Sequence, residues 1–431
     1  MLRHDEILAA FLLALAGRRG QELFFSESKR LCIEIDPNRA VRSKMHTAVG
    51  VAGRTYTGRT LSFAYQDGYC RDALDDLLEQ CCRVVGTEQT SDPFAMESQG
   101  TELVEVCDLE DGQVQEVANS LFEEGKKAAL DIRRVYFQGQ VDSYCLANNY
   151  GLRGNGYSAL YSWGFEYSSS RDNDSFAYYT LHPRNTFDLH TMITEAKTAA
   201  IMADAPTLVF RDVPVVFTRS ATAVLLFSLM SLMTSEALWK KHTFLRGLKE
   251  PIIVSEKVTV IENSRQNLYH RGGVDGEGSP KKEITIIERG IVRTVLSDLL
   301  TGQSVGLEST GSSYRHSFRD MPRVRGTKIA MSAGDDTEGQ LLSKYPDLAV
   351  ISNLMGLAAC LDPTSSRFQV AADAYLYRLG HIQGKSRILI NSSLIDIFRN
   401  VIDIGSERGY GADGSLYVPS IVVYPISIMC I

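Results

Sequence analysis

The hydrophobic pattern at the start of the chain predicts two helices around a group of strands. Apolar residues recur at helical spacing in Asp5–Leu15 and again in Cys70–Val85. Between them, runs rich in β-branched and aromatic residues predict the strands Glu22–Glu27, Arg30–Asp36, Thr47–Gly53 and Thr60–Tyr65. We therefore predict an amino-terminal α/β domain over residues 1–90.

The next part of the chain mixes helices and strands again. Ser91–Gly100 is polar and contains Pro93, which predicts a linker. Helical spacing follows in Gly112–Ala129 and Phe187–Ala203. The predicted strands are Arg133–Gln138, Val141–Asn148, Tyr157–Ser168 and Ser175–Thr180, with turns at Asn155-Gly156 and Asn173-Asp174. We interpret residues 91–205 as a central α/β domain.

Strands dominate the last part, residues 206–431. One long helix is predicted over Ser220–Trp239, and it should be buried on most sides because Ala221–Met233 is almost entirely apolar. A short helix is predicted over Leu394–Val401. The predicted strands are Val209–Phe217, Ile252–Glu262, Glu283–Glu288, Ile291–Leu296, Thr327–Met331, Phe368–Arg378, Ile388–Ile390 and Pro419–Met429. The whole chain predicts an α+β fold with a large β-rich carboxy-terminal domain.

Composition narrows the classes of function. A chain of 431 residues can form more than one domain. Its net charge of −7 gives no reason to expect nucleic-acid binding. The eight cysteines form no CxxC pair, which fits free thiols in a reducing cytoplasm.

The apolar run Leu8–Ala16 is the one candidate targeting signal. It is too short to span a bilayer. Asp5 and Glu6 precede it, where a signal peptide carries positive charge. We therefore expect a cytoplasmic protein without a membrane segment.

The segment Asp275–Gly334 is rich in glycine and in motifs. Arg289-Gly290 predicts a hairpin turn between the strands Glu283–Glu288 and Ile291–Leu296. The spacing alone is typical of an ordinary glycine-rich hairpin. Asp275 and Glu277 are two residues apart in a glycine loop, a pattern that favours a structural role in which carboxylates hold backbone amides and arginines.

The same segment resembles the TldD/PmbA family. Asp275–Pro280 matches D-x-E-G-x-P, Ile287–Val292 matches I-x-x-G-x-L/V, Leu296–Asp298 matches L-x-D, and Gly306–Gly311 matches G-x-x-S-T-G. Proteins of this family were first described as modulators of DNA gyrase and later as peptidases. The resemblance implies the family's fold and peptide processing in a closed chamber. The residues we expect near that chamber are Asp275, Glu277, Gly278, Ser309, Thr310 and Gly311.

The resemblance also implies where a metal site would lie. TldD-type members carry H-E-x-x-x-H on the helix that corresponds to Ser220–Trp239, and a cysteine in a late C-G-x-D-G-x context. This chain has Phe227 and Leu232 at the two histidine positions, Ser228 at the glutamate position and Tyr410 at the cysteine position. Catalytic zinc needs three protein donors. We therefore expect no metal and no catalytic residue in this chain.

Members without these ligands form the PmbA (TldE) branch. The resemblance implies a non-catalytic subunit with no cofactor of its own, which pairs with a zinc-bearing TldD-type chain as a heterodimeric peptidase for small or unfolded peptides. Peptide capture would use exposed strand edges. The alternatives are a metal-free homodimer that binds peptides or proteins and, ranked last, a regulator of DNA gyrase.

Other polar clusters have simpler interpretations. His182, Asp188 and His190 do not form a recognised zinc motif, and a loop that enters a helix explains them. His242 follows the long helix, where a cation suits the helix dipole better than a role as substitute ligand. The arginine-rich loop Tyr314–Lys328 favours a solvated loop, or one that steers acidic peptides or the partner.

Overall fold

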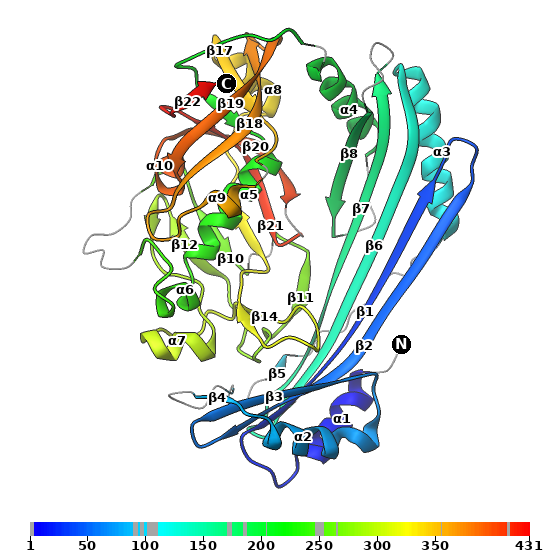
Figure 1. The fold of residues 1–431 in the computed structure, drawn as a ribbon, viewed down its shortest axis with the longest axis vertical. Helices are drawn as coiled ribbons and strands as arrows, with labels where there is room; N and C mark the ends of the chain where they lie inside the picture. Colours follow the sequence, from blue (N-terminus) through cyan, green and yellow to red (C-terminus); the bar gives the residue numbers. More distant parts are fainter. Residues whose placement is uncertain are drawn as a thin grey trace.

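A computed structural model describes most of the chain. The described residues are 4–88, 94, 99–100, 111–169, 175–183, 188–203, 205–245, 254–263, 266–354, 356–411 and 414–431. They form two large sheets with helices on their faces, which confirms the predicted α+β class. Figure 1 shows one sheet as a long curved blade and the other within a rounder, β-rich body beside it.

The first sheet is built from unusually long strands. Its order is β11-β7-β6-β1-β2-β3-β4, and β5 and β8 pair with β7. The strands are β1 (Gln21–Ile35), β2 (Val41–Thr57), β3 (Thr60–Asp67), β4 (Thr87–Glu88), β5 (Gln99–Gly100), β6 (Leu130–Asn148), β7 (Arg153–Ser169), β8 (Ser175–His182) and β11 (His270–Gly272).

Two predicted pairs of short strands are single strands in the structure. Glu22–Glu27 and Arg30–Asp36 both lie in β1, and Arg133–Gln138 and Val141–Asn148 both lie in β6. The polar residues between them do not end the strands, because β1 and β6 pair with each other without interruption from Glu22–Asn148 to Ile35–Val135. The prediction of separate strands was therefore wrong.

The β1–β6 pairing also joins the first two predicted units. Strands from residues 1–90 and from residues 91–205 lie side by side in one sheet (Figure 1). The proposed linker Ser91–Gly100 and the turn Asn173-Asp174 lie largely outside the described residues. The domain boundaries at residues 90 and 205 stay predictions.

Helices cover the two ends of this sheet. At one end, α1 (His4–Leu15), the short η1 (Arg71–Ala73) and α2 (Leu74–Arg83) lie together, and Phe11 and Leu77 pack with Phe25 of β1. At the other end lie α3 (Asp111–Lys127) and α4 (Leu189–Ala203), as Figure 1 shows. Leu121 of α3 packs there with Trp163 of β7. Each helix presents one apolar face to the sheet, as its spacing predicts.

The second sheet forms the carboxy-terminal half. Its path is β13-β12-β10-β16-β21-β9-β17-β18-β19-β22, and β20 pairs with β21. The strands are β9 (Val215–Phe217), β10 (Val260–Glu262), β12 (Ile284–Glu288), β13 (Ile291–Val292), β16 (Ile329–Met331), β17 (Asp347–Ile351), β18 (Arg367–Arg378), β19 (His381–Ser393), β20 (Val401–Gly411), β21 (Leu416–Val423) and β22 (Ile428–Cys430). A separate pair joins β14 (Ser313–Tyr314) to β15 (Arg323–Val324).

The helix α5 (Arg219–Leu232) contributes Ala221, Leu225 and Leu229 to the largest apolar core of this half. The other helices are α6 (Ser235–Trp239), α7 (Leu299–Val305), α8 (Glu338–Lys344), α9 (Leu357–Cys360) and α10 (Leu394–Arg399). Among the described residues, no helix is both long enough and apolar enough to cross a membrane.

Several predicted elements of this half differ from the structure. In the described part of Ile252–Glu262 only Val260–Glu262 is a strand, β10, and of Ile291–Leu296 only Ile291–Val292 is a strand, β13. The single helix Ser220–Trp239 is two helices, because Thr234 leaves helical geometry and its hydroxyl caps α6 by accepting from the Ala237 amide at 3.0 Å. Of the predicted strand Val209–Phe217, only the residues after Pro214 form a strand, β9. The strand Pro419–Met429 is divided between β21 and β22.

The predicted hairpin at Arg289-Gly290 is present. The two residues have φ of 44° and 81°, and β12 pairs with β13 on either side of them. Positive φ at both central residues is the geometry of a type I′ turn. Glycine at the second position adopts a positive φ with little steric strain.

Phe318 joins the two halves of the molecule. Its ring is 1% exposed and lies with Phe24 of β1 and Leu146 of β6 in a small apolar cluster. It covers Gly50 of β2 so closely that a Cβ there would come within 2.4 Å of the ring. The carboxy-terminal half therefore places one aromatic side chain directly on the first sheet.

We predict that Phe318→Ala destabilises the protein, because it removes this buried ring and leaves a cavity between the halves. The expected loss is about 3–5 kcal/mol in the free energy of unfolding. Urea denaturation followed by tryptophan fluorescence measures it. Leu13→Ala is the control, since Leu13 is 63% exposed on α1. Equal stability of the two variants would contradict the assigned contact.

Candidate functional site

The positions where the resemblance places metal ligands lie on and beside α5. Phe227 is 38% exposed, whereas Ser228 and Leu232 are buried. The Ser228 hydroxyl donates to the Val224 carbonyl one turn earlier, at 2.8 Å. β20 runs close against the same helix, since a Cβ on Gly411 would come within 2.1 Å of the Ala223 side chain. The four candidate positions therefore belong to one packed region.

Tyr410 of β20 occupies the cysteine position in that region. Its hydroxyl accepts from the Leu268 amide at 3.2 Å. Its ring lies 5.3 Å from the ring of His182 and 4.7 Å from that of Tyr417. The position therefore carries a phenol that packs against other rings, and no thiolate or imidazole that could bind zinc.

These residues do not fit a zinc ion. A phenyl ring and an isobutyl group replace the two imidazoles, and a phenol replaces the thiolate. Within the part of the chain that the structure describes, no group of three or more His, Cys, Asp or Glu side chains is placed to hold a metal. Asp188 instead accepts from the His190 amide at 3.0 Å and from the Thr191 hydroxyl at 2.7 Å, at the start of α4.

A pocket of about 460 Å³ opens beside Phe227 and Leu232, the residues at the two histidine positions. Its wall joins the end of α5, the turn into α6, Leu296 and the strand β15. The lining residues are Phe227, Met230, Ser231, Leu232, Thr234, Glu236, Ala237, Lys240, His242, Leu296, Arg323, Val324, Arg325, Gly326, Ile329 and Pro363. Sequence reasoning missed this pocket, because its wall comes from segments that no spacing rule connects.

The motif residue Asp275 organises the glycine loop beside this region. It is 1% exposed. One carboxylate oxygen accepts from the amides of Glu277 and Ser279, each at 2.9 Å. The other oxygen accepts from the Ser313 amide at 2.9 Å. The structure thus confirms the structural interpretation of Asp275 as an acceptor for backbone amides.

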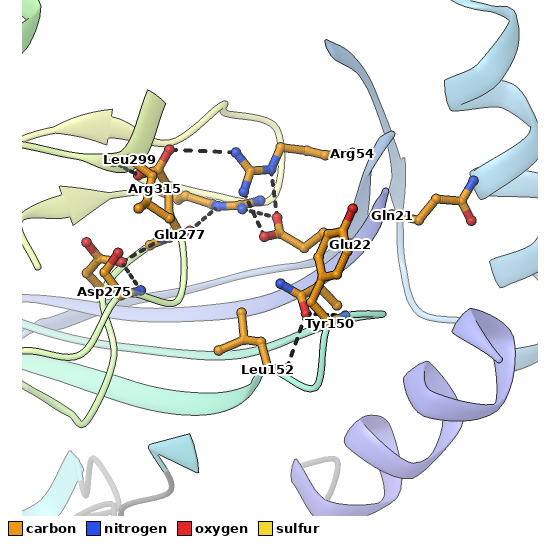
Figure 2. Close-up of polar contacts among 12 residues, drawn as sticks. Gln21, Glu22, Arg54, Tyr150, Leu152, Asp275, Glu277, Leu299 and Arg315 are labelled. Carbon is orange, nitrogen blue, oxygen red and sulfur yellow. Dashed lines mark hydrogen bonds and ion pairs between the residues drawn. The ribbon is translucent and has the colours of Figure 1, made fainter. Parts of the chain in front are cut away.

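Glu277 belongs to a buried ionic cluster that connects the first sheet to the glycine-rich segment of the carboxy-terminal half (Figure 2). Glu22 of β1 accepts two hydrogen bonds from Arg54 of β2, both at 2.7 Å. Arg315 donates a further hydrogen bond to Glu22 and one to the Gly276 carbonyl at 2.7 Å. Glu277 lies 3.9 Å from Arg54 and accepts from the Leu299 amide at 2.8 Å.

Burial controls the charges in this cluster. Burial alone would raise the pKa of Glu22, but Arg315 and Arg54 outweigh it and hold that pKa below its ordinary value. Burial raises the pKa of Glu277 well above the ordinary value, and the nearby carboxylates of Asp298 and Asp275 add to the shift. Burial likewise raises the pKa of Asp275 to about 6, against the effect of its amide donors.

The predicted chamber residues lie inside the protein. Asp275, Glu277, Gly278, Thr310 and Gly311 are buried, and Ser309 is partly buried. Thr310 exchanges hydrogen bonds with Ser297, whose amide donates to the Thr310 hydroxyl at 2.8 Å. The placement of these residues near a chamber stays a prediction. Because they are buried, they would affect the chamber through the shape of their loop.

The arginine-rich loop is less solvated than its sequence predicts. Arg315 is 6% exposed and belongs to the ionic cluster, so its assignment to a solvated loop was wrong. Arg319 is exposed and pairs with Asp67 of the first sheet at 2.5 Å. Arg323 and Arg325 line the pocket. The arginines of this loop therefore lie in three different environments, which are the ionic cluster, the surface beside Asp67 and the pocket.

Comparisons with known proteins agree on one family. The family model described as PmbA/TldA metallopeptidase C-terminal domain matches residues 211–429. An uncharacterized protein from Methanocaldococcus jannaschii is 20% identical over 93% of this chain and 94% of its own length. A metalloprotease TldD homolog from Buchnera aphidicola is 27% identical, over 36% of this chain and 32% of its own.

Solved structures show the same fold over nearly the whole chain. TldE from Thermococcus kodakarensis superposes with a TM-score of 0.85 at 16% identity, and covers 99% of this chain and 100% of that one. A proposed modulator of a DNA gyrase from Thermotoga maritima gives a TM-score of 0.83 at 18% identity, with the same coverage. At these identities the likeness concerns the fold.

We predict that Glu277→Gln changes how stability depends on pH. Because the folded-state pKa of Glu277 is raised, the folded protein binds more protons than the unfolded chain between about pH 4.3 and that pKa. Wild-type stability should therefore fall as the pH rises through this window, by up to about 1.4 kcal/mol per pH unit from this group. The glutamine variant lacks this loss.

The measurement is the difference in unfolding free energy between Glu277→Gln and wild type, taken from pH 4 to pH 9 by urea denaturation. The difference should shift in favour of the variant as pH rises, whatever its constant offset. Glu308→Gln, at an exposed position in the same segment, is the control. A difference independent of pH would contradict a raised pKa at Glu277.

Proposed function

Because the chain belongs to the TldD/PmbA family, we propose that it is the non-catalytic subunit of a heterodimeric TldD-type zinc peptidase. In this proposal the TldD-type partner holds the zinc and carries out the cleavage. This chain completes the chamber and binds the peptide. The substrates are small or unfolded peptides, because a closed chamber excludes folded proteins.

The side chains at the four ligand positions carry the proposal. Phe227, Ser228, Leu232 and Tyr410 stand where the resemblance expects histidine, glutamate, histidine and cysteine. Leu232 packs in the core around α5, Ser228 bonds back to its own helix, Tyr410 packs against the rings near β20, and Phe227 contacts the Arg325 guanidinium. A metallopeptidase-like fold with these positions filled by packing residues supports a subunit that depends on a catalytic partner.

An exposed strand edge supports a partner with a different sequence. Residues 41–48 of β2 are all exposed, and β3 pairs with β2 only from Gly50 onward. Within the described residues, the first part of β2 pairs only with β1, and Figure 1 shows it at the margin of the long sheet. Such an edge offers main-chain donors and acceptors to another strand.

The charges on this edge bear on the alternative of a homodimer. Arg42, Lys44 and His46 alternate along β2 and so point to one face. In an antiparallel pair related by a two-fold axis, this face of one copy lies opposite the same face of the other, so the basic residues of both copies would meet. Like charges directly opposite destabilise a pair. A partner strand with acidic side chains fits this edge, and self-pairing there does not.

A role as regulator of a DNA enzyme has less support. Contact with DNA would depend on the cations of the arginine-rich loop Tyr314–Lys328. Arg315 is buried with Glu22, and Arg319 pairs with Asp67. The loop therefore presents fewer cations to a polyanion than its sequence suggests.

We predict that the pair of chains cleaves peptides in a zinc-dependent way. This chain alone, or a variant of it alone, should not cleave them. The assay mixes purified protein with a fluorogenic unstructured peptide, in the presence and absence of the cognate TldD-type chain. Chelator should abolish cleavage by the pair. Chelator-sensitive cleavage by this chain alone, at a rate comparable to that of the pair, would refute the proposal.

We further predict that the double variant Arg42→Glu, Lys44→Glu weakens binding of the TldD-type chain by about tenfold or more, because it replaces attraction with repulsion across the edge. Biolayer interferometry at low salt measures the dissociation constant. Arg71→Glu, Arg83→Glu, at exposed positions of η1 and α2 at the other end of the long sheet, makes the same change of charge away from the edge. Equal effects of the two double variants would exclude the edge as the interface.

A further inference from the structure

One face of the long sheet carries an open groove of about 580 Å³ between β2 and β8, which we call the sheet groove. We propose that it binds an extended segment of the substrate peptide, with an aromatic side chain of that segment against Tyr179. This inference rests on the proposed function, because it names the surface of this chain that holds the peptide. Every residue that lines the sheet groove belongs to the described part of the chain.

The sheet groove lies on the face opposite α3. Ala118 of α3 packs with Phe137 of β6 on the covered face. Side chains alternate between the two faces of a strand, so Gln138 points the other way, into the groove. Further along β6, Tyr144 of the same face donates to the Val274 carbonyl of the carboxy-terminal half at 2.7 Å. The sheet groove therefore shares its face with the contact between the two halves.

The strand register aligns the lining residues, together with Gly164, in two rows that cross the sheet. Directly paired residues of neighbouring strands lie side by side on one face. The first row consists of Lys44, Cys32, Gln138 and Ser162, and the second row consists of Arg42, Glu34, Tyr136, Gly164 and Tyr179. The central side chains of the first row are shorter than the two tyrosines, so the first row forms a floor and the second row forms a wall.

Tyr179 presents an aromatic surface in this wall, and it is 58% exposed. It lies over Gly164, where a Cβ would come within 2.3 Å of its ring. Its ring centre is 6.4 Å from that of Tyr136, whose hydroxyl donates to Glu166 at 2.6 Å. These neighbours hold the Tyr179 ring against the sheet and leave its outer surface accessible. Another aromatic ring packs favourably on such a surface, in offset or edge contact.

The floor offers hydrogen bonds without charge. Cys32, Gln138 and Ser162 supply a thiol, an amide and a hydroxyl group, and the amide and the hydroxyl both donate and accept. Such groups suit the main chain of an extended peptide, which carries a donor and an acceptor at almost every residue. Tyrosines beside small polar side chains also form the binding surfaces of antibodies. The floor therefore favours main-chain contacts that place few demands on the peptide sequence.

The charges around the sheet groove favour an uncharged segment. Glu34 of the wall lies 3.1 Å from Arg134 and 3.4 Å from Arg42, so its carboxylate is already paired. Lys44 and Arg42 stand at the margin formed by β2, where the proposed function places acidic side chains of the partner. The centre of the groove is polar and aromatic, which matches a neutral peptide segment with one aromatic residue.

The sheet groove is long enough for a short peptide and leads toward the partner. It extends from β2 across β1, β6 and β7 to β8, and four strand spacings correspond to about 19 Å. This length accommodates about five extended residues. A peptide in the groove would continue over the exposed edge of β2 to the partner, which holds the zinc in the proposed function.

The first test compares two fluorescein-labelled, amidated hexapeptides of Gly and Ser that differ in one central residue, phenylalanine or alanine. Fluorescence anisotropy with the purified chain alone gives the dissociation constants. We expect the phenylalanine peptide to bind at least about fivefold more tightly, because only it places a ring against Tyr179. Equal affinity for the two peptides would overturn the proposal.

Substitutions locate the binding site. Ser162→Arg should weaken binding of the phenylalanine peptide by about tenfold or more, because the longer side chain occupies the floor. Ser120→Arg, the same change at an exposed position of α3 on the opposite face, should leave binding unchanged. Tyr179→Ser should remove the preference for phenylalanine, whereas Tyr179→Phe, which still covers Gly164, should keep it. A preference that survives both Ser162→Arg and Tyr179→Ser would place binding elsewhere and refute this site.

The assembled pair separates this inference from the proposed function. With the TldD-type chain present, Ser162→Arg should raise KM for the phenylalanine peptide and leave kcat unchanged, because the chemistry takes place at the zinc of the partner. An unchanged KM would remove the sheet groove as a substrate site but leave the proposed function. Loss of peptide binding when the partner is added would show that the partner covers the groove, and would also refute the inference. A wild-type pair without zinc-dependent cleavage would instead contradict the proposed function.

Discussion

The structure depends on a buried cluster of charges between its two halves. Glu22 and Arg54 belong to the long sheet, and Arg315 and Glu277 come from the glycine-rich segment of the other half. All four side chains are almost completely buried. Burying an ion costs several kcal/mol, and only close opposite charges and hydrogen bonds offset that cost. The cluster therefore favours the position of the segment on the sheet in which these partners meet.

The same segment transmits this constraint to the pocket. Glu277 accepts from the first amide of α7, and Asp298 caps that helix through Thr301. The Thr301 hydroxyl lies 2.6 Å from that of Ser235 at the start of α6. The Ser235 amide in turn donates to the Leu296 carbonyl in the pocket wall. The motif residues thus shape the pocket through a continuous set of hydrogen bonds, although they are buried and lie outside it.

The sequence was informative where local chemistry decides the outcome. The amphipathic helices, the turn at Arg289-Gly290 and the amide-binding role of Asp275 follow from spacing and residue type. The break at Thr234 was missed, because the apolar run continues to Met233 and a single capping hydroxyl decides where α5 ends. Two short strands were predicted in place of β1, because the middle of β1 is polar. This polar middle is nevertheless paired with a strand on each side, which spacing does not reveal.

The burial of Arg315 could not be predicted, because its partner Glu22 lies 293 residues away. The pocket was missed for a similar reason. Phe227 and Leu232 were recognised as substitutes for metal ligands, but the arginines that face them come from a distant loop. Long-range pairing of this kind follows from the tertiary structure and leaves no periodic signal in the sequence.

In the proposed function, this chain carries residues that cannot bind zinc at the ligand positions of a metallopeptidase-like fold and depends on a partner for the metal. The most direct test is the zinc content of the purified chain after dialysis against chelator and re-exposure to zinc, measured by inductively coupled plasma mass spectrometry. We expect far less than one zinc per chain when the protein is alone and about one zinc per pair when it is assembled with a TldD-type chain. One tightly held zinc in each isolated chain would contradict it.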